Sequence, residues 1–92
     1  MKKYTVKISK TADADIEKHK RAGKKSSIKK IARILDELEA HPYSGTGKPE
    51  ALKHELSGKW SRRINKKDRI IYTVHDQMVE VAVLSAMGHY SD

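Results

Sequence analysis

The fold of this 92-residue chain is best predicted from one stretch, GTGKPEALKHELSGKWSRRINKKDRIIYTV, which spans residues 45–74. It opens with two glycines and a proline, which is typical of a turn-rich loop. Beyond this loop, large side chains recur at every second position, as in a β-strand. The alternating sets are Leu52, His54 and Leu56; Trp60, Arg62 and Ile64; Ile70, Tyr72 and Val74; and, further on, Val79, Val81 and Val83. This pattern predicts three or four antiparallel strands, with hairpin connections at 65–69 and 75–78.

Three further elements are predicted ahead of this stretch. Residues 4–9 alternate and favour a strand. Residues 9–22 favour a helix that Ser9 or Thr11 caps, and Gly23 is a plausible stop. A second helix is predicted over 26–40, and its apolar side chains fall within an arc of about 120°. These side chains are Ile28, Ile31, Ala32, Leu35 and Leu38.

The order of these elements predicts the fold class. A strand and two helices come first, and the antiparallel strands follow together. Helices that are segregated on one antiparallel sheet define an α+β domain. Because the chain has no phenylalanine, aliphatic residues must fill the core, together with Trp60 and Tyr72.

Composition restricts the classes of function. The chain has no cysteine, so disulfides, thiol nucleophiles and thiolate metal sites are excluded. The start of the sequence has no apolar stretch after its lysines, and no run approaches the roughly 20 apolar residues that span a bilayer. We therefore expect a cytoplasmic protein that does not associate with membranes.

The charge is strongly positive and uneven. Twenty Lys and Arg stand against twelve Asp and Glu, for a net charge of +8, and all twenty cations fall within 1–69. In a small domain this excess indicates a polyanionic partner. Charge alone does not separate RNA, DNA, a ribosome, a membrane or an acidic protein from a merely solvated surface.

The polar residues suggest a specific chemistry if they share one face of the sheet. Glu50 follows the loop, Lys53, Arg63 and Arg69 come from neighbouring strand regions, and His89 and Tyr90 follow the last strand. A base, an acid and a basic cradle are sufficient to cleave RNA without a metal. Arg63 and Arg69 share a face only if an odd number of residues connects them or a bulge intervenes, and they then lie opposite each other.

At these residues the sequence resembles a known family. The block at 45–74, the terminal HY at 89–90 and the order of elements are similar to the YoeB-type toxins, also called the Txe group, of the RelE/ParE superfamily. The resemblance implies one RelE/YoeB-like domain over 1–92, with the α+β fold of microbial ribonucleases. It also implies the toxin of a type II toxin–antitoxin module, an endoribonuclease that cuts mRNA in the ribosomal A site.

The resemblance also implies roles for individual residues. Glu50 matches the general base, Arg69 an arginine that stabilises the transition state, His89 the general acid, and Tyr90 the terminal aromatic residue. Arg63 matches a second such arginine. Lys53 matches a phosphate contact, and we group His54 beside it as RNA-binding. The family often has a basic residue shortly before HY, where this chain has Met87 and Gly88, so a cationic contact there is in doubt.

Implied partners are a YefM/Axe-like antitoxin, mRNA and the bacterial ribosome, with a homodimer or a hetero-oligomer with the antitoxin as the assembly. No cofactor and no metal are expected, since His19, His41 and His75 lack metal-ligand spacing. Two alternatives stay open: a non-catalytic ParE-like toxin that acts on DNA gyrase, and a plain nucleic-acid-binding module.

Overall fold

The computed structural model describes residues 3–88 and confirms the predicted α+β class. The elements are β1 (Thr5–Ile8), α1 (Lys10–Arg21), α2 (Lys25–Leu38), β2 (Glu50–Ala51), the 3₁₀ helix η1 (His54–Leu56), β3 (Trp60–Arg63), β4 (Arg69–His75), the 3₁₀ helix η2 (Asp76–Met78) and β5 (Glu80–Ser85). As predicted, Ser9 caps α1: its Oγ accepts a hydrogen bond from the Ala12 N–H at 3.0 Å.

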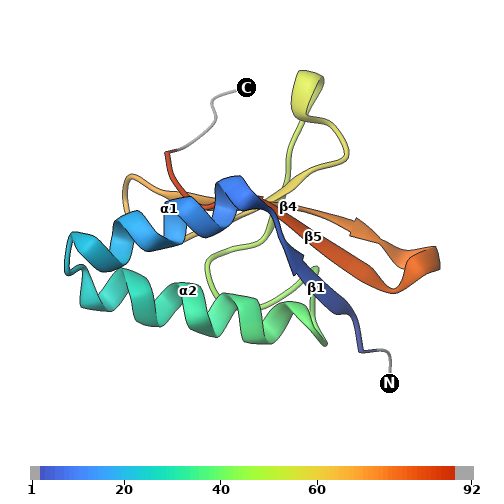
Figure 1. Ribbon diagram of the computed structural model, residues 1–92. Helices are drawn as coiled ribbons and strands as arrows, with labels where there is room; N and C mark the ends of the chain where they lie inside the picture. Colours follow the sequence, from blue (N-terminus) through green and yellow to red (C-terminus); the bar gives the residue numbers. More distant parts are fainter. Residues whose placement is uncertain (1–2, 89–92) are drawn as a thin grey trace.

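The strands form one mixed sheet in the order β1-β5-β4-β3-β2. Strands β2 to β5 pair antiparallel, as predicted, whereas β1 pairs parallel to β5. A parallel pair needs a crossover, and here α1 and α2 are part of the connection from β1 to the other strands. Both helices lie together on one side of the sheet (Figure 1).

The core lies between α2 and the central strands, and it shows that the predicted apolar stripe of α2 is partly wrong. Ile31 and Leu38 are buried as predicted, but Ile28 and Leu35 are only half-buried. Ala32, also in the predicted stripe, is exposed, whereas Ile34, which lies outside it, is fully buried. The buried stripe of α2 is therefore rotated around the helix by about one residue from the predicted stripe. Periodicity could not locate its centre because apolar residues cover a wide arc of this helix.

The strand predicted from Leu52, His54 and Leu56 is also wrong. Only Glu50–Ala51 pairs with β3, and the chain then turns into η1. Local hydrogen bonds from Leu56 N to Lys53 O, at 3.1 Å, and from Ser57 N to His54 O, at 3.0 Å, replace the ladder. His54 has φ +57°, which an extended strand cannot contain.

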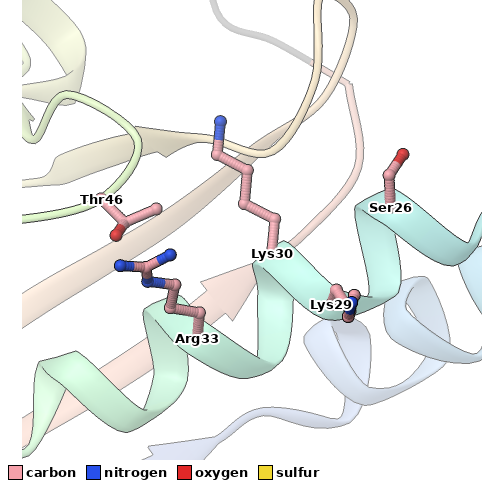
Figure 2. A pocket seen from close by; sticks show the side chains of 5 residues that line it. All are labelled: Ser26, Lys29, Lys30, Arg33 and Thr46. Atoms are coloured by element: carbon pink, nitrogen blue, oxygen red, sulfur yellow. The ribbon is translucent and has the colours of Figure 1, made fainter.

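Basic side chains of α2 line a concavity beside the loop that contains Thr46. Lys29, Lys30 and Arg33 line a concavity of about 430 Å³ together with Ser26 and Thr46. In Figure 2 the Arg33 side chain points across the gap toward Thr46. Among the described residues, no helix is long and apolar enough to cross a membrane.

Candidate active site

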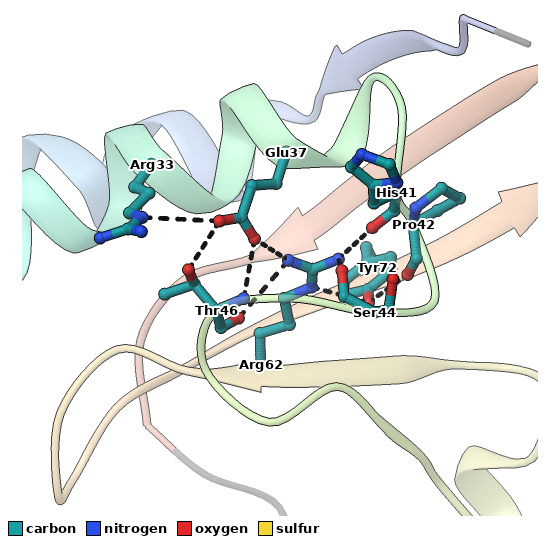
Figure 3. Close-up of polar contacts among 8 residues, drawn as sticks. All are labelled: Arg33, Glu37, His41, Pro42, Ser44, Thr46, Arg62 and Tyr72. Carbon is teal, nitrogen blue, oxygen red and sulfur yellow. Dashed lines mark hydrogen bonds and ion pairs between the residues drawn. The ribbon is translucent and has the colours of Figure 1, made fainter. Parts of the chain in front are cut away.

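A buried arginine holds the loop that leads to Glu50. Arg62 lies on β3 and points to the helix side of the sheet, where its side chain is fully buried. Its guanidinium donates to Glu37 Oε1 at 2.8 Å, to Ser44 O at 2.8 Å and to the His41 carbonyl (Figure 3). One cation thereby satisfies acceptors from α2 and from the loop. No role was predicted for Arg62 from the sequence, because an alternating position in a strand does not show which residues its side chain contacts.

Glu37 completes this network from α2. Its carboxylate accepts from the Thr46 N–H at 2.8 Å and from the Thr46 hydroxyl at 2.6 Å. Burial alone would raise the pKa of Glu37. The hydrogen bonds from Thr46 and the Arg62 charge outweigh that effect, and the pKa is lowered from its ordinary value of 4.5. The network therefore stays ionised at neutral pH.

The two glycines of the loop are required by close packing rather than by phosphate binding. A Cβ on Gly45 would lie 2.3 Å from Glu37 Oε1, and a Cβ on Gly47 would lie 2.7 Å from Arg63 O. Both residues also have positive φ, at +124° and +86°. The Arg63 N–H donates to Gly47 O at 2.6 Å, so this part of the loop is held against β3.

The other end of the loop is anchored by aromatic residues. The Tyr4 and Tyr43 hydroxyls each donate to the Asp76 carboxylate at 2.5 Å. This hydrogen bond, together with burial, raises the pKa of Tyr43 to about 12. The Tyr43 ring also packs on Trp60, with centroids 5.1 Å apart. The loop is therefore fixed at both ends, and this fixes the position at which β2 begins with Glu50.

The loop ends at a pocket of about 230 Å³ on the sheet face opposite Arg62. Its lining residues are Lys48, Pro49, Glu50, Arg63 and Arg69. Arg63 and Arg69 are Cα partners across β3 and β4, joined by the five residues 64–68. The odd number meets the condition that the sequence set for the two arginines to share a face. The predicted connection at 65–69 extended one residue too far, because Arg69 already lies in β4.

Glu50 enters this pocket from β2, where it pairs with Ser61. Its Oε1 lies 3.5 Å from Arg69 Nη1, and its side chain is 64% exposed. Arg69 is the more covered partner, at 24%. Two arginines that face each other repel, and the carboxylate offsets part of that repulsion. Three cations and one carboxylate leave the pocket with an excess of positive charge that suits a phosphate.

The structure brings together only some of the predicted site residues. Lys53 and His54 are exposed in the turn after β2, and neither is among the residues that line the pocket. His89 and Tyr90 lie outside the described residues. Lys48 lines the pocket although it had no predicted role. Its place beside Pro49 and Glu50 in KPE was the available signal.

Within residues 3–88, no group of three or more His, Asp or Glu side chains is arranged to hold a metal ion. The three histidines differ in their surroundings. His19 is fully buried, whereas His41 and His75 are exposed. Tyr72 is buried in the core as predicted, and Trp60 is half-buried at its edge.

Comparisons with known proteins agree with this fold. A sequence model of the family described as "YoeB-like toxin of bacterial type II toxin-antitoxin system" matches residues 8–90. Toxin RelK of Mycobacterium tuberculosis is 44% identical over 69 residues, which cover 75% of this chain and 79% of RelK. The chain therefore belongs to the YoeB-like toxins of type II toxin–antitoxin systems, in the RelE/ParE superfamily.

Solved structures show the same fold. A YoeB/ParE toxin from Agrobacterium tumefaciens superposes with a TM-score of 0.84 at 29% identity, over 94% of this chain and 99% of that chain. The toxin chain in the heterotetrameric YoeB–YefM complex from Staphylococcus aureus gives a TM-score of 0.76 at 34% identity, over 95% and 98%. The fold is that of a RelE/YoeB-like toxin.

Proposed function

We propose that this toxin is a ribosome-dependent, metal-independent endoribonuclease that cuts mRNA in the A site. The observation that supports this most is the pocket in which Glu50 lies 3.5 Å from Arg69 while Arg63 faces Arg69 across the hairpin. A carboxylate that is exposed and also in contact with a phosphate-binding cation can serve as a base beside a bound phosphodiester.

The proposed reaction needs no cofactor. Glu50 takes the proton of a ribose 2′-hydroxyl, and the freed oxygen forms a bond to the adjacent phosphorus. The bond from phosphorus to the 5′-oxygen breaks, and His89 gives its proton to that leaving oxygen. Arg63 and Arg69 stabilise the charge that grows on the phosphoryl oxygens. Lys48 joins them as a cation of the same pocket.

Three further residues have proposed supporting roles. Tyr90 stacks on a substrate base, as terminal aromatic residues do with unpaired RNA. Lys53 and His54 contact the RNA backbone where it leaves the pocket. The ribosome holds the message in the bent conformation that attack by the 2′-oxygen requires.

The test is single-turnover cleavage of ribosome-bound mRNA, mapped by primer extension. We expect discrete cuts with the unmodified chain and little cleavage with Glu50→Gln. Arg69→Ala should lower the cleavage rate far more than it lowers ribosome binding, because its contact strengthens as charge develops. Arg21→Ala, which removes an exposed cation at the end of α1, is the control. Intact message together with inhibition of DNA gyrase would favour a ParE-like toxin instead.

The end of the chain is tested in the same assay. His89→Gln should slow cleavage by roughly 10²–10⁴-fold, the usual loss for a general acid. Tyr90→Ala should also impair cleavage. Deleting Ser91 and Asp92 is the matched control and should leave activity intact, since neither residue matches a position in the family pattern. A His89→Gln variant that cuts at the wild-type rate would show that the acid lies elsewhere.

The proposed partner is a YefM/Axe-like antitoxin with an acidic, partly apolar segment that folds across the basic face and covers the pocket. A net charge of +8 favours such a partner, and a segment of this kind can fold as it binds. Harmless expression of the toxin alone, with no small acidic protein co-purifying from its own host, would contradict this.

A further inference from the structure

The segment Ala86–Gly88 follows β5 and leads directly to His89. It is held by buried, titratable side chains that the proposed reaction does not use. Asp15 and His19 come from α1, and Asp68 comes from the hairpin between β3 and β4. Their side chains are 7%, 0% and 3% exposed. We call these three residues the terminal clamp.

The terminal clamp contacts three of the polar backbone groups of this segment. The Ala86 N–H donates to Asp15 Oδ2 at 3.0 Å, and the Ala86 carbonyl lies 2.8 Å from His19 Nε2. The Gly88 N–H donates to Asp68 Oδ1 at 2.9 Å. Because a carbonyl can only accept, His19 must carry a proton on Nε2. Its Nδ1 is buried without a hydrogen-bond partner.

Burying a carboxylate raises the free energy of the folded state unless hydrogen-bond donors surround it. A strand can end without a buried carboxylate, so these side chains indicate that the position of the segment is important. Asp68 is itself oriented, because Asn65 Nδ2 donates to its Oδ2 at 3.1 Å and to Ser27 Oγ at 2.9 Å. Burial alone would raise the pKa of Asp68. The Gly88 and Asn65 hydrogen bonds outweigh burial and lower the pKa, so the carboxylate remains an acceptor.

The clamped segment also touches the pocket. The Gly88 carbonyl, another polar group of its backbone, accepts from the Arg69 N–H at 2.9 Å. The Arg69 side chain reaches Glu50 at 3.5 Å. One residue therefore joins the base of the proposed reaction to the last described residue before His89. Gly88 has φ +71°, a left-handed conformation that favours glycine and redirects the chain at this point.

We propose that Asp15, His19 and Asp68 are positioning residues that fix the point and direction in which the chain leaves β5 beside Arg69, and thereby fix where the segment that carries the proposed general acid His89 begins. The catalytic part of this inference rests on the proposed ribonuclease function. It also gives Gly88 a structural role in the segment where the family often has a basic residue.

The clamp itself is tested without any measurement of activity. Asp15→Leu removes the acceptor for the Ala86 N–H while keeping the branched shape of the side chain, whereas Asp15→Asn retains an acceptor oxygen. We expect amide hydrogen exchange at Ala86 to speed up by roughly 5- to 150-fold in Asp15→Leu, the factor for leaving one buried donor unpaired. Asp15→Asn should stay near the wild-type rate, and the amide of Tyr72 in the core should not change in either variant. Unchanged exchange at Ala86 in Asp15→Leu would overturn the clamp.

Asp68→Ala is the second variant if Asp15→Leu fails to fold. It removes the acceptor for the Gly88 N–H without adding volume. Faster exchange at Gly88 is expected, and unchanged exchange there would again overturn the proposal.

The link to catalysis is tested by a double-mutant cycle. Asp15→Leu should slow single-turnover cleavage, whereas ribosome binding and the melting temperature of the protein should change little. In a His89→Gln background it should cause no further loss, because the group it positions is already absent. Additive losses would show that the clamp acts by another route and would overturn its positioning role. If the unmodified chain cuts no ribosome-bound message, the proposed function fails and the catalytic part fails with it, whereas the exchange rates still decide the clamp.

Discussion

Arg62 and Arg63 are adjacent in sequence and have opposite environments. Alternation along β3 sends Arg62 beneath α2, fully buried, and sends Arg63 into the open pocket. Arg62 is an ion-pair partner and a hydrogen-bond donor to the loop. Arg63 is available to an anion. Their different surroundings, rather than their identical chemistry, separate a structural cation from a proposed functional one.

The first prediction concerns Arg62. Arg62→Met should lower the free energy of unfolding by about 3–5 kcal/mol, because it leaves Glu37 and several loop carbonyls without their buried partner. Urea denaturation measures this loss. Arg63→Met is the matched control at an exposed position, and its effect should stay within about 0.5 kcal/mol. Equal losses in the two variants would contradict the role of the buried network.

The second prediction concerns the pH dependence that Glu37 brings. Its folded-state pKa is lowered from 4.5, so its contribution to stability is fully present above the unfolded-state pKa. That contribution is lost as pH falls through the lowered value in the folded state. We therefore expect the free energy of unfolding to fall below about pH 4.5, and to fall less steeply in Glu37→Gln. Parallel pH profiles for the two proteins would exclude Glu37 as the source.

At the scale of elements, α2 serves two purposes on different sides. One side carries the core stripe of Ile31, Ile34 and Leu38. Another carries Glu37, which holds Thr46 and Arg62. The same helix therefore stabilises the sheet and sets the loop that positions Glu50. A shift of α2 along the sheet would disturb the pocket that contains Glu50, although no residue of α2 lines that pocket.

The third prediction separates the two candidate core positions of this helix. Ile34→Ala should cost about 2–5 kcal/mol, because Ile34 is fully buried. Leu35→Ala should cost less, since Leu35 is half-buried at the edge of the core. Thermal and urea unfolding of both variants would check the order. A larger loss for Leu35→Ala would favour the stripe that the sequence alone predicted.

At the scale of the whole molecule, the sheet separates a packed face from a basic open one. The helices and the core occupy one face, and the pocket with Glu50, Arg63 and Arg69 occupies the other. The cations of α2 form a second basic concavity beside Thr46. The loop that contains Thr46 also leads to Lys48 at the pocket. Positive charge is therefore spread over more than one surface.

The fourth prediction follows from this distribution. Binding of the proposed acidic antitoxin segment should weaken as salt concentration rises, because exposed charges are screened over about 8–10 Å at physiological ionic strength. Titration calorimetry at several salt concentrations would measure this. Lys48→Ala should reduce the salt dependence more than Lys67→Ala if the segment covers the pocket, since Lys67 is exposed in the hairpin and does not line it. Salt-independent affinity would contradict an electrostatic contribution.

The sequence by itself determined the order of the main elements, the α+β class and the family. It also set the condition for Arg63 and Arg69 to share a face, an odd number of connecting residues, which the five residues 64–68 meet. Helix and strand periods depend on neighbouring residues, so they are visible along the chain. The residues of the pocket were predicted mainly through the family resemblance, and Lys48 was missed.

Only the tertiary structure decided which charges are buried and what they hold. The parallel pairing of β1 with β5, the contact between Arg62 and Glu37, and the terminal clamp each join residues that are far apart in the sequence. At 54–56 an alternating pattern became a 3₁₀ turn because local hydrogen bonds replaced the ladder. Burial depends on what packs opposite a side chain, and no local pattern contains that information.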